Sequence, residues 1–142
     1  MSVELGQILW LKIRFNNSGD ISPTVHPYLI LFKDSDLNYI EVGQLDSLKG
    51  KEYKATFRCN HPIYCSNPTE FVLLKDSFLQ MDNEFRLENY PGLCRFRLTD
   101  EKLSIAKFNE ARDAYMAYHN NYTIDNNKSV YLTKEEIEFL NK

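Results

Sequence analysis

The 142-residue chain has few of the residues that usually mark a site: 3 Cys, 3 His, 5 Gly and 1 Trp. The cysteines are odd in number, and no CxxC pair or cluster of Cys and His is present. The sequence therefore predicts neither a disulfide framework nor a metal site. We expect Cys59, Cys65 and Cys94 to be reduced thiols that pack as small hydrophobic side chains. No cofactor is predicted.

Several familiar motifs are also missing. The chain has no glycine-rich phosphate loop, no GxSxG and no HExxH, which excludes most of the common enzyme classes. Its longest apolar runs are far shorter than the ~20 residues of a membrane-spanning helix. The first fifteen residues lack the basic start and apolar core of a secretory signal. These absences predict a cytoplasmic protein with no membrane partner.

The charge balance is nearly even, with 17 basic and 20 acidic residues and a net charge of −3. Binding to nucleic acid would therefore need a local basic patch. The hydrophobic fraction of 43% and the charged fraction of 26% are typical of a globular domain. The length predicts a single domain over residues 1–142. The aromatic fraction of 13% is high and favours pleated surfaces or partner-binding faces.

Residues 1–98 have the short alternating patterns of strands separated by turns, which predicts a small β-barrel or sandwich. The expected strands are Gln7–Phe15, His26–Lys33, Tyr39–Leu45, Tyr53–Cys59, Phe71–Leu74 with Phe78–Met81, and Phe85–Leu87. The segment His61–Thr69 contains two prolines and is expected to be a loop.

The apolar period becomes helical after residue 98. Residues 99–119 place apolar side chains three and four positions apart, which predicts an amphipathic helix. That stripe consists of Ile105, Phe108, Ala111, Tyr115 and Tyr118. Residues 120–142 are expected to form an Asn-rich loop and a short last helix. Thr133 and Glu136 form a capping box for this helix, and Leu132 and Ile137 are placed as a hydrophobic staple.

One candidate catalytic group follows from the strand pattern. His26 begins a strand, while Asp46 and Ser47 follow the strand Tyr39–Leu45. Antiparallel strands bring such positions to the same end of a sheet. A histidine near a carboxylate or hydroxyl can act as a general acid or base near neutral pH. The alternative is structural: the His-Pro pair starts a strand and the Asp-Ser pair makes a turn.

A basic segment follows these residues. Four cations oppose the single Glu52 within ten residues: Lys49, Lys51, Lys54 and Arg58. They are candidates for binding RNA phosphates. The alternative is that they are the solvated face of a hairpin.

The order of several short motifs resembles the MazF/PemK/Kid toxin family over roughly residues 5–115. The matching positions are Gly6 and Trp10, Pro27 with Tyr28–Leu31, Asp46 with Ser47, Met81 with Asp82, and Arg86 with Leu87. The resemblance implies an SH3-like small barrel, α+β with C-terminal helices. It also implies a homodimer that cleaves single-stranded RNA sequence-specifically without a metal and is neutralised by a cognate antitoxin protein.

The chain departs from that family at one important position. The Arg that precedes Pro in the family is His26 here, and a neutral imidazole cannot stabilise phosphorane charge as a guanidinium does. By this resemblance His26 would transfer protons, and Asp46 or Ser47 would orient it. Lys49, Lys51, Lys54 or Arg58 would neutralise the phosphate. Two alternatives remain: a catalytically silent barrel that binds a protein or nucleic acid, and the gyrase-poisoning branch of the same fold.

Overall fold

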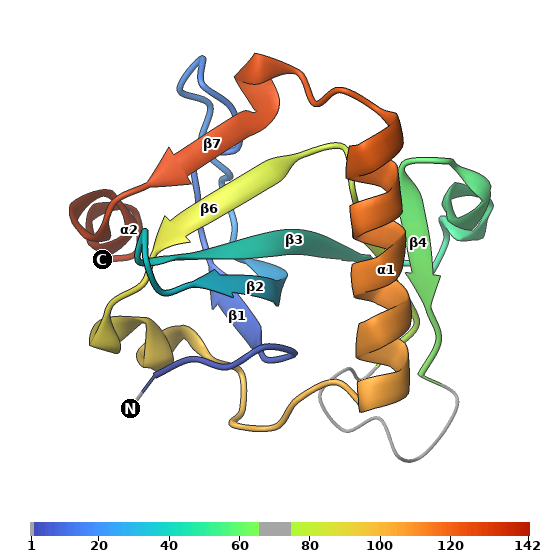
Figure 1. The fold of residues 1–142 in the computed structure, drawn as a ribbon, viewed down its shortest axis with the longest axis horizontal. Helices are drawn as coiled ribbons and strands as arrows, with labels where there is room; N and C mark the ends of the chain where they lie inside the picture. The colour runs from blue at the N-terminus through green and yellow to red at the C-terminus, as the bar shows by residue number, and fades with distance from the viewer. Residues whose placement is uncertain (1, 66–74) are drawn as a thin grey trace.

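The chain folds around one seven-stranded, mainly antiparallel sheet with helices toward its C-terminus, an α+β arrangement (Figure 1). The computed structural model describes residues 2–65 and 75–142. The strands are β1 (Ile8–Leu11), β2 (His26–Asp34), β3 (Tyr39–Ser47), β4 (Asn60–Ile63), β5 (Ser77–Gln80), β6 (Glu84–Glu88) and β7 (Ser129–Leu132). The mainly β architecture with C-terminal helices is therefore confirmed.

Strand β3 is the centre of the sheet. One edge pairs with β2, while the other edge pairs first with β6 and then with β5, so that the order continues to β4. Gly43 lies between these two halves, where an added Cβ would come within 2.4 Å of Leu79 Cδ1. Within the described residues no pairing joins the edge strands β1 and β4, and the sheet stays open.

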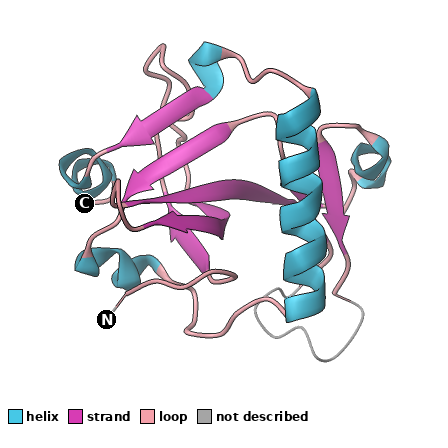
Figure 2. Cartoon of the chain, in the orientation of Figure 1, coloured by secondary structure: helices cyan, strands magenta, loops and turns pink. Residues whose placement is uncertain are grey.

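Two hydrophobic clusters cover the sheet because consecutive side chains of a strand point to opposite faces. In β2, Tyr28 and Ile30 belong to one cluster, while Leu29 and Leu31 belong to the other. The first cluster is completed by the short helix α2 (Lys134–Leu140), and the second by α1 (Ile105–Asn121). Figure 2 shows the strands at the centre and the helices around them.

The strand predicted at Tyr53–Cys59 is wrong. Residues Glu52–Thr56 form a 3₁₀ helix, η1, without a buried residue. The strand instead forms at Asn60–Ile63 and overlaps the start of the expected loop His61–Thr69, because the edge of β5 offers it backbone partners and Ile63 becomes buried. The alternation in Tyr53–Cys59 reflects side chains that stay at the surface. The predicted strand Phe71–Leu74 lies outside the described residues.

Helix α1 begins at Ile105 instead of at residue 99 and ends at Asn121. The delay has a local cause, since the N–H of Leu103 donates to the carbonyl of Gly6 and holds the preceding segment against the N-terminal strand region. Phe108 is buried as the stripe predicts, whereas Ile105 is exposed.

The C-terminal segment adds strand β7, which the sequence did not indicate. It pairs in parallel with β6, and α1 forms the connection between the two strands. The predicted cap of α2 is confirmed: Thr133 Oγ1 accepts a hydrogen bond from the N–H of Glu136 at 3.3 Å. Leu132 and Ile137 are both buried in the first cluster.

Two short 3₁₀ helices complete the chain, η2 (Pro91–Phe96) and η3 (Asn126–Lys128). Cys59, Cys65 and Cys94 form no disulfide, as predicted. In the part of the chain that the structure describes, no helix has the length and apolar character needed to cross a membrane.

Candidate functional site

His26 lies at the start of β2 and faces a small polar pocket. The pocket measures about 230 Å³ and is lined by Phe15, Ser22, His26, Tyr28, Gln44, Gln80 and Asn83. His26 is half-buried, and its Nε2 lies 3.4 Å from Thr24 Oγ1. The imidazole is thus accessible and beside amide groups, but no Lys or Arg is among the described residues that line the pocket.

Asp46 and Ser47 lie at the same end of the β2–β3 pair as His26. The register pairs Tyr28 with Gln44, which places His26 and Asp46 two residues beyond that pair. The carboxylate of Asp46 is engaged elsewhere, since it accepts from Lys51 Nζ at 3.1 Å and from the N–H of Ser47 at 2.8 Å. Among the described residues, no hydrogen bond joins either side chain to His26.

The predicted basic residues surround η1, which lies beside β4 in Figure 1. Lys51 is paired with Asp46, whereas Lys49 and Lys54 have no ion-pair partner within the described ranges. Arg58 is exposed, and its guanidinium carbon lies 5.6 Å from the centre of the Tyr122 ring. The four cations therefore lie on or beside one short segment of the chain, from Lys49 to Arg58.

Exposed aromatic rings accompany these cations. Tyr53 is 62% exposed and Phe57 is 45% exposed, and their rings meet edge to face with centroids 5.7 Å apart. Tyr64, on the segment after β4, is also exposed. We call Lys49, Tyr53, Lys54, Phe57 and Arg58 the η1 surface.

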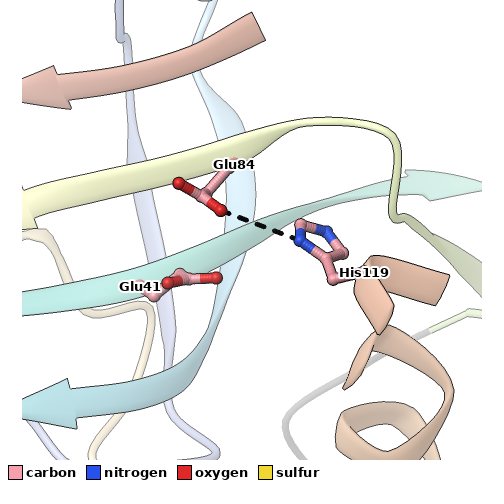
Figure 3. A group of neighbouring side chains, drawn as sticks. All are labelled: Glu41, Glu84 and His119. Atoms are coloured by element: carbon pink, nitrogen blue, oxygen red, sulfur yellow. Dashed lines mark ion pairs between the residues drawn. The ribbon is translucent and has the colours of Figure 1, made fainter. Parts of the chain in front are cut away.

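A second group of chemically active side chains was missed by sequence analysis. Glu41 on β3, Glu84 on β6 and His119 on α1 each offer a ligand atom, and these atoms all lie within 4.8 Å of one another (Figure 3). His119 Nδ1 is 3.8 Å from Glu84 Oε2. The sequence showed no metal-ligand spacing, yet the fold assembles a set of carboxylate and imidazole groups.

Hydrogen bonds orient each member of this group. His119 Nε2 donates to the carbonyl of Met81 at 2.8 Å, because a carbonyl can only accept. The guanidinium of Arg86 contacts Oε1 of both Glu41 and Glu84, at 3.2 and 3.4 Å. Ser129 Oγ also donates to Glu84 Oε1 at 2.9 Å.

Tyr115 links the group to the interior. Its hydroxyl donates to Glu41 Oε2 at 2.7 Å, and its ring stacks on His119 with centroids 4.0 Å apart. Burial raises the pKa of Tyr115, and the negative charge of Glu41 raises it further. The phenol therefore remains a neutral hydrogen-bond donor.

Glu84 and His119 also line an open pocket of about 350 Å³ next to residues 120–126. Three asparagines contribute to its polar lining, which consists of Glu84, His119, Asn120, Asn121, Tyr122, Thr123, Ile124, Asn126 and Ser129. The Asn-rich loop after α1 thus forms a wall beside the two ligating side chains. A small polar molecule or water can reach them from solvent.

Comparison with known proteins gives no assignment: no protein-family model matches the chain, and no curated protein matches it. The geometry of the two sites and the surface around η1 is the basis for the proposals below.

Proposed function

We propose that the protein binds single-stranded RNA through the η1 surface. The observation that carries this proposal is the placement of exposed Tyr53 on η1 and exposed Phe57 at its C-terminal cap, among the cations at 49–58. Aromatic rings stack on unpaired bases, and neighbouring Lys and Arg side chains neutralise phosphates. Proteins that bind single-stranded nucleic acid without strict sequence preference combine these two features.

Charge supports this location over others on the molecule. The whole chain carries −3, so general electrostatic attraction does not favour a polyanion. Lys49, Lys54 and Arg58 form a local exception, because Asp46 is already paired with Lys51 and Lys75 accompanies Asp76 beside Lys49. Glu52 is the remaining acidic residue of this segment. The segment therefore retains a positive charge that can attract RNA.

Fluorescence anisotropy with labelled single-stranded RNA at several salt concentrations tests the proposal. Tyr53→Ala and Phe57→Ala should each cost roughly 1–3 kcal/mol of binding free energy. Lys54→Ala and Arg58→Ala should each weaken binding and lower the salt slope by about 0.7 per contact. None of these four side chains belongs to either hydrophobic cluster, so the substitutions should not disturb the core.

Matched controls lie on α2, at the opposite side of the molecule in Figure 1. Phe139→Ala and Lys134→Ala remove an exposed ring and an exposed cation there, and they should not change the affinity. Equal losses from the η1 and α2 variants, or no binding at low salt, would contradict the proposal.

RNA cleavage at His26 is a second candidate, favoured by the position of this imidazole in a pocket with the amides of Gln44, Gln80 and Asn83. It is the activity that the toxin-family resemblance implies, together with an SH3-like barrel, a homodimer and an antitoxin partner. Its reaction would use the ribose 2′-OH as nucleophile, with His26 transferring a proton. Binding is the first proposal, because no cation of the described chain lines this pocket.

Mapping of RNA ends in EDTA tests cleavage. Cleavage should persist in EDTA, fail on a substrate with a 2′-deoxyribose at the cut, and fall by about 10²–10⁴ in His26→Ala. An unchanged rate in His26→Ala would exclude this role. If the protein binds RNA but does not cleave it, RNA binding is the only one of the two functions that is supported.

A further inference from the structure

The hydrogen bond at Nε2 leaves Nδ1 of His119 directed toward carboxylates. Its Nε2–H is donated to the carbonyl of Met81, so the unprotonated nitrogen of the neutral ring is Nδ1. This atom faces Glu84 Oε2 at 3.8 Å, which is too long for a hydrogen bond. Glu41 offers a second carboxylate oxygen within 4.8 Å. Three electron-pair donors thus converge from three different elements.

We propose that Glu41, Glu84 and His119 bind a divalent transition-metal ion of the Zn²⁺ class. Mg²⁺ and Ca²⁺ prefer sites made of oxygen atoms alone, whereas an imidazole nitrogen beside carboxylates suits Zn²⁺ and its first-row neighbours. Three protein ligands leave a fourth tetrahedral position for water or another small ligand. None of the three ligands belongs to the η1 surface, although Arg58 of that surface lies over Tyr122, which lines the pocket beside Glu84 and His119. The inference does not depend on RNA binding.

The second layer of contacts matches that of a built metal site. Ligating histidines commonly donate their other N–H to a carbonyl or carboxylate, as His119 does to Met81. Arg86 holds Oε1 of both glutamates, and Ser129 adds a bond to Glu84. These contacts leave Oε2 of Glu84 directed toward His119.

The group carries a net negative charge, since two carboxylates and the guanidinium of Arg86 sum to −1, and this charge attracts a cation. Ligand atoms around tetrahedral Zn²⁺ are about 3.4 Å apart, given metal–ligand bonds of about 2.0–2.1 Å. The distance of 3.8 Å between His119 Nδ1 and Glu84 Oε2 exceeds this value, so these two side chains would have to move slightly closer around the ion. Glu84 and His119 are half-buried beside the open pocket.

The pocket of about 350 Å³ supplies the route of entry and the open coordination position. Two of the three ligands, Glu84 and His119, line it directly, while Glu41 is buried behind them. A structural metal site would be closed on all sides by protein ligands. The geometry therefore indicates a site at which the ion remains accessible to solvent.

Titration calorimetry of the full chain with ZnCl₂, after removal of metals by chelation and dialysis, is the first test. We expect one equivalent to bind, and at least a 10-fold loss of affinity in Glu84→Gln and in His119→Gln. The matched controls are the other two histidines and a half-buried thiol, changed in His26→Gln, His61→Gln and Cys59→Ser. These variants should bind Zn²⁺ as the parent does.

Co²⁺ substitution provides a readout that does not depend on the folding of a variant. The unmodified protein should give the intense visible d–d bands of a tetrahedral Co²⁺ ion without thiolate charge-transfer absorption, and Zn²⁺ should displace it. Bound Zn²⁺ should also raise the melting temperature. Absence of stoichiometric binding, or binding lost in a control variant and kept in His119→Gln, would overturn the site.

Discussion

The hydroxyl of Tyr115 donates a 2.7 Å hydrogen bond to the buried carboxylate of Glu41. This bond joins the second half of α1 to the central strand β3 and lies beneath the ring of His119. Removing one partner of a buried hydrogen bond to a charged group leaves the other without compensation.

We therefore expect Tyr115→Phe to lower the free energy of unfolding by about 1–3 kcal/mol, measured by urea denaturation. Tyr28→Phe is the matched control, because Tyr28 is equally buried but its hydroxyl makes no hydrogen bond to the described protein. It should cost less. Equal losses for the two variants would contradict a specific contribution of the Glu41 contact.

Arg14 forms a bidentate ion pair that joins the N-terminal strand region to α2. Its Nε and Nη2 donate to the two carboxylate oxygens of Glu136 at 2.7 and 3.2 Å, and this hydrogen bonding raises the pKa of Arg14. A double-mutant cycle of Arg14→Lys with Glu136→Gln should give a coupling of about 1–2 kcal/mol, because Lys cannot form the forked contact.

The exposed pair Lys102 and Glu4 is the control for that cycle, at 3.2 Å. Its coupling should lie within about 0–1 kcal/mol, as is usual at the surface. A coupling for Arg14 no larger than this would show that the forked geometry adds nothing.

Gly43 leaves room for two buried leucines. An added Cβ would lie 2.4 Å from Leu79 Cδ1 and 3.2 Å from Leu31 Cδ1, and both leucines are fully buried. Gly43→Ala should therefore destabilise the protein by about 1–3 kcal/mol through overpacking. In a Leu79→Val background the same change should cost less; an unchanged cost in both backgrounds would refute the steric explanation.

His61 makes stability depend on pH. Burial lowers the pKa of His61, and the negative charge of Glu110 on α1 opposes this only in part. In the unfolded state His61 binds a proton near the usual pKa of about 6.5. In the native state it binds a proton only at lower pH, because burial lowers its pKa. Stability should therefore rise with pH through this region and fall as the solution is acidified below it.

His61→Gln should flatten that part of the stability profile, and Glu110→Gln should lower the pKa of His61 further. NMR titration of the imidazole resonances measures the pKa directly. A His61 midpoint at or above the usual value would show that burial does not control this group.

Local pattern was sufficient for several elements. The strands at His26, Tyr39 and Phe78 form because short continuous apolar runs suit a sheet covered on both faces, and the strand at Phe85 alternates between buried and half-buried residues. The cap at Thr133 needs only its own hydroxyl and the next turn of backbone. In these segments the conformation that the local sequence favours is also the one that the tertiary structure favours.

Edge strands and the Glu41, Glu84 and His119 group depended on tertiary structure. Strands β4 and β7 form because β5 and β6 present unpaired backbone edges, which no property of Asn60–Ile63 or Ser129–Leu132 indicates by itself. The apolar faces, the helix cap and the cluster of cations at 49–58 follow from local sequence. Only the fold decided that one glutamate of β3, one of β6 and a histidine of α1 would meet, because their proximity results from strand register and helix docking and not from spacing along the chain.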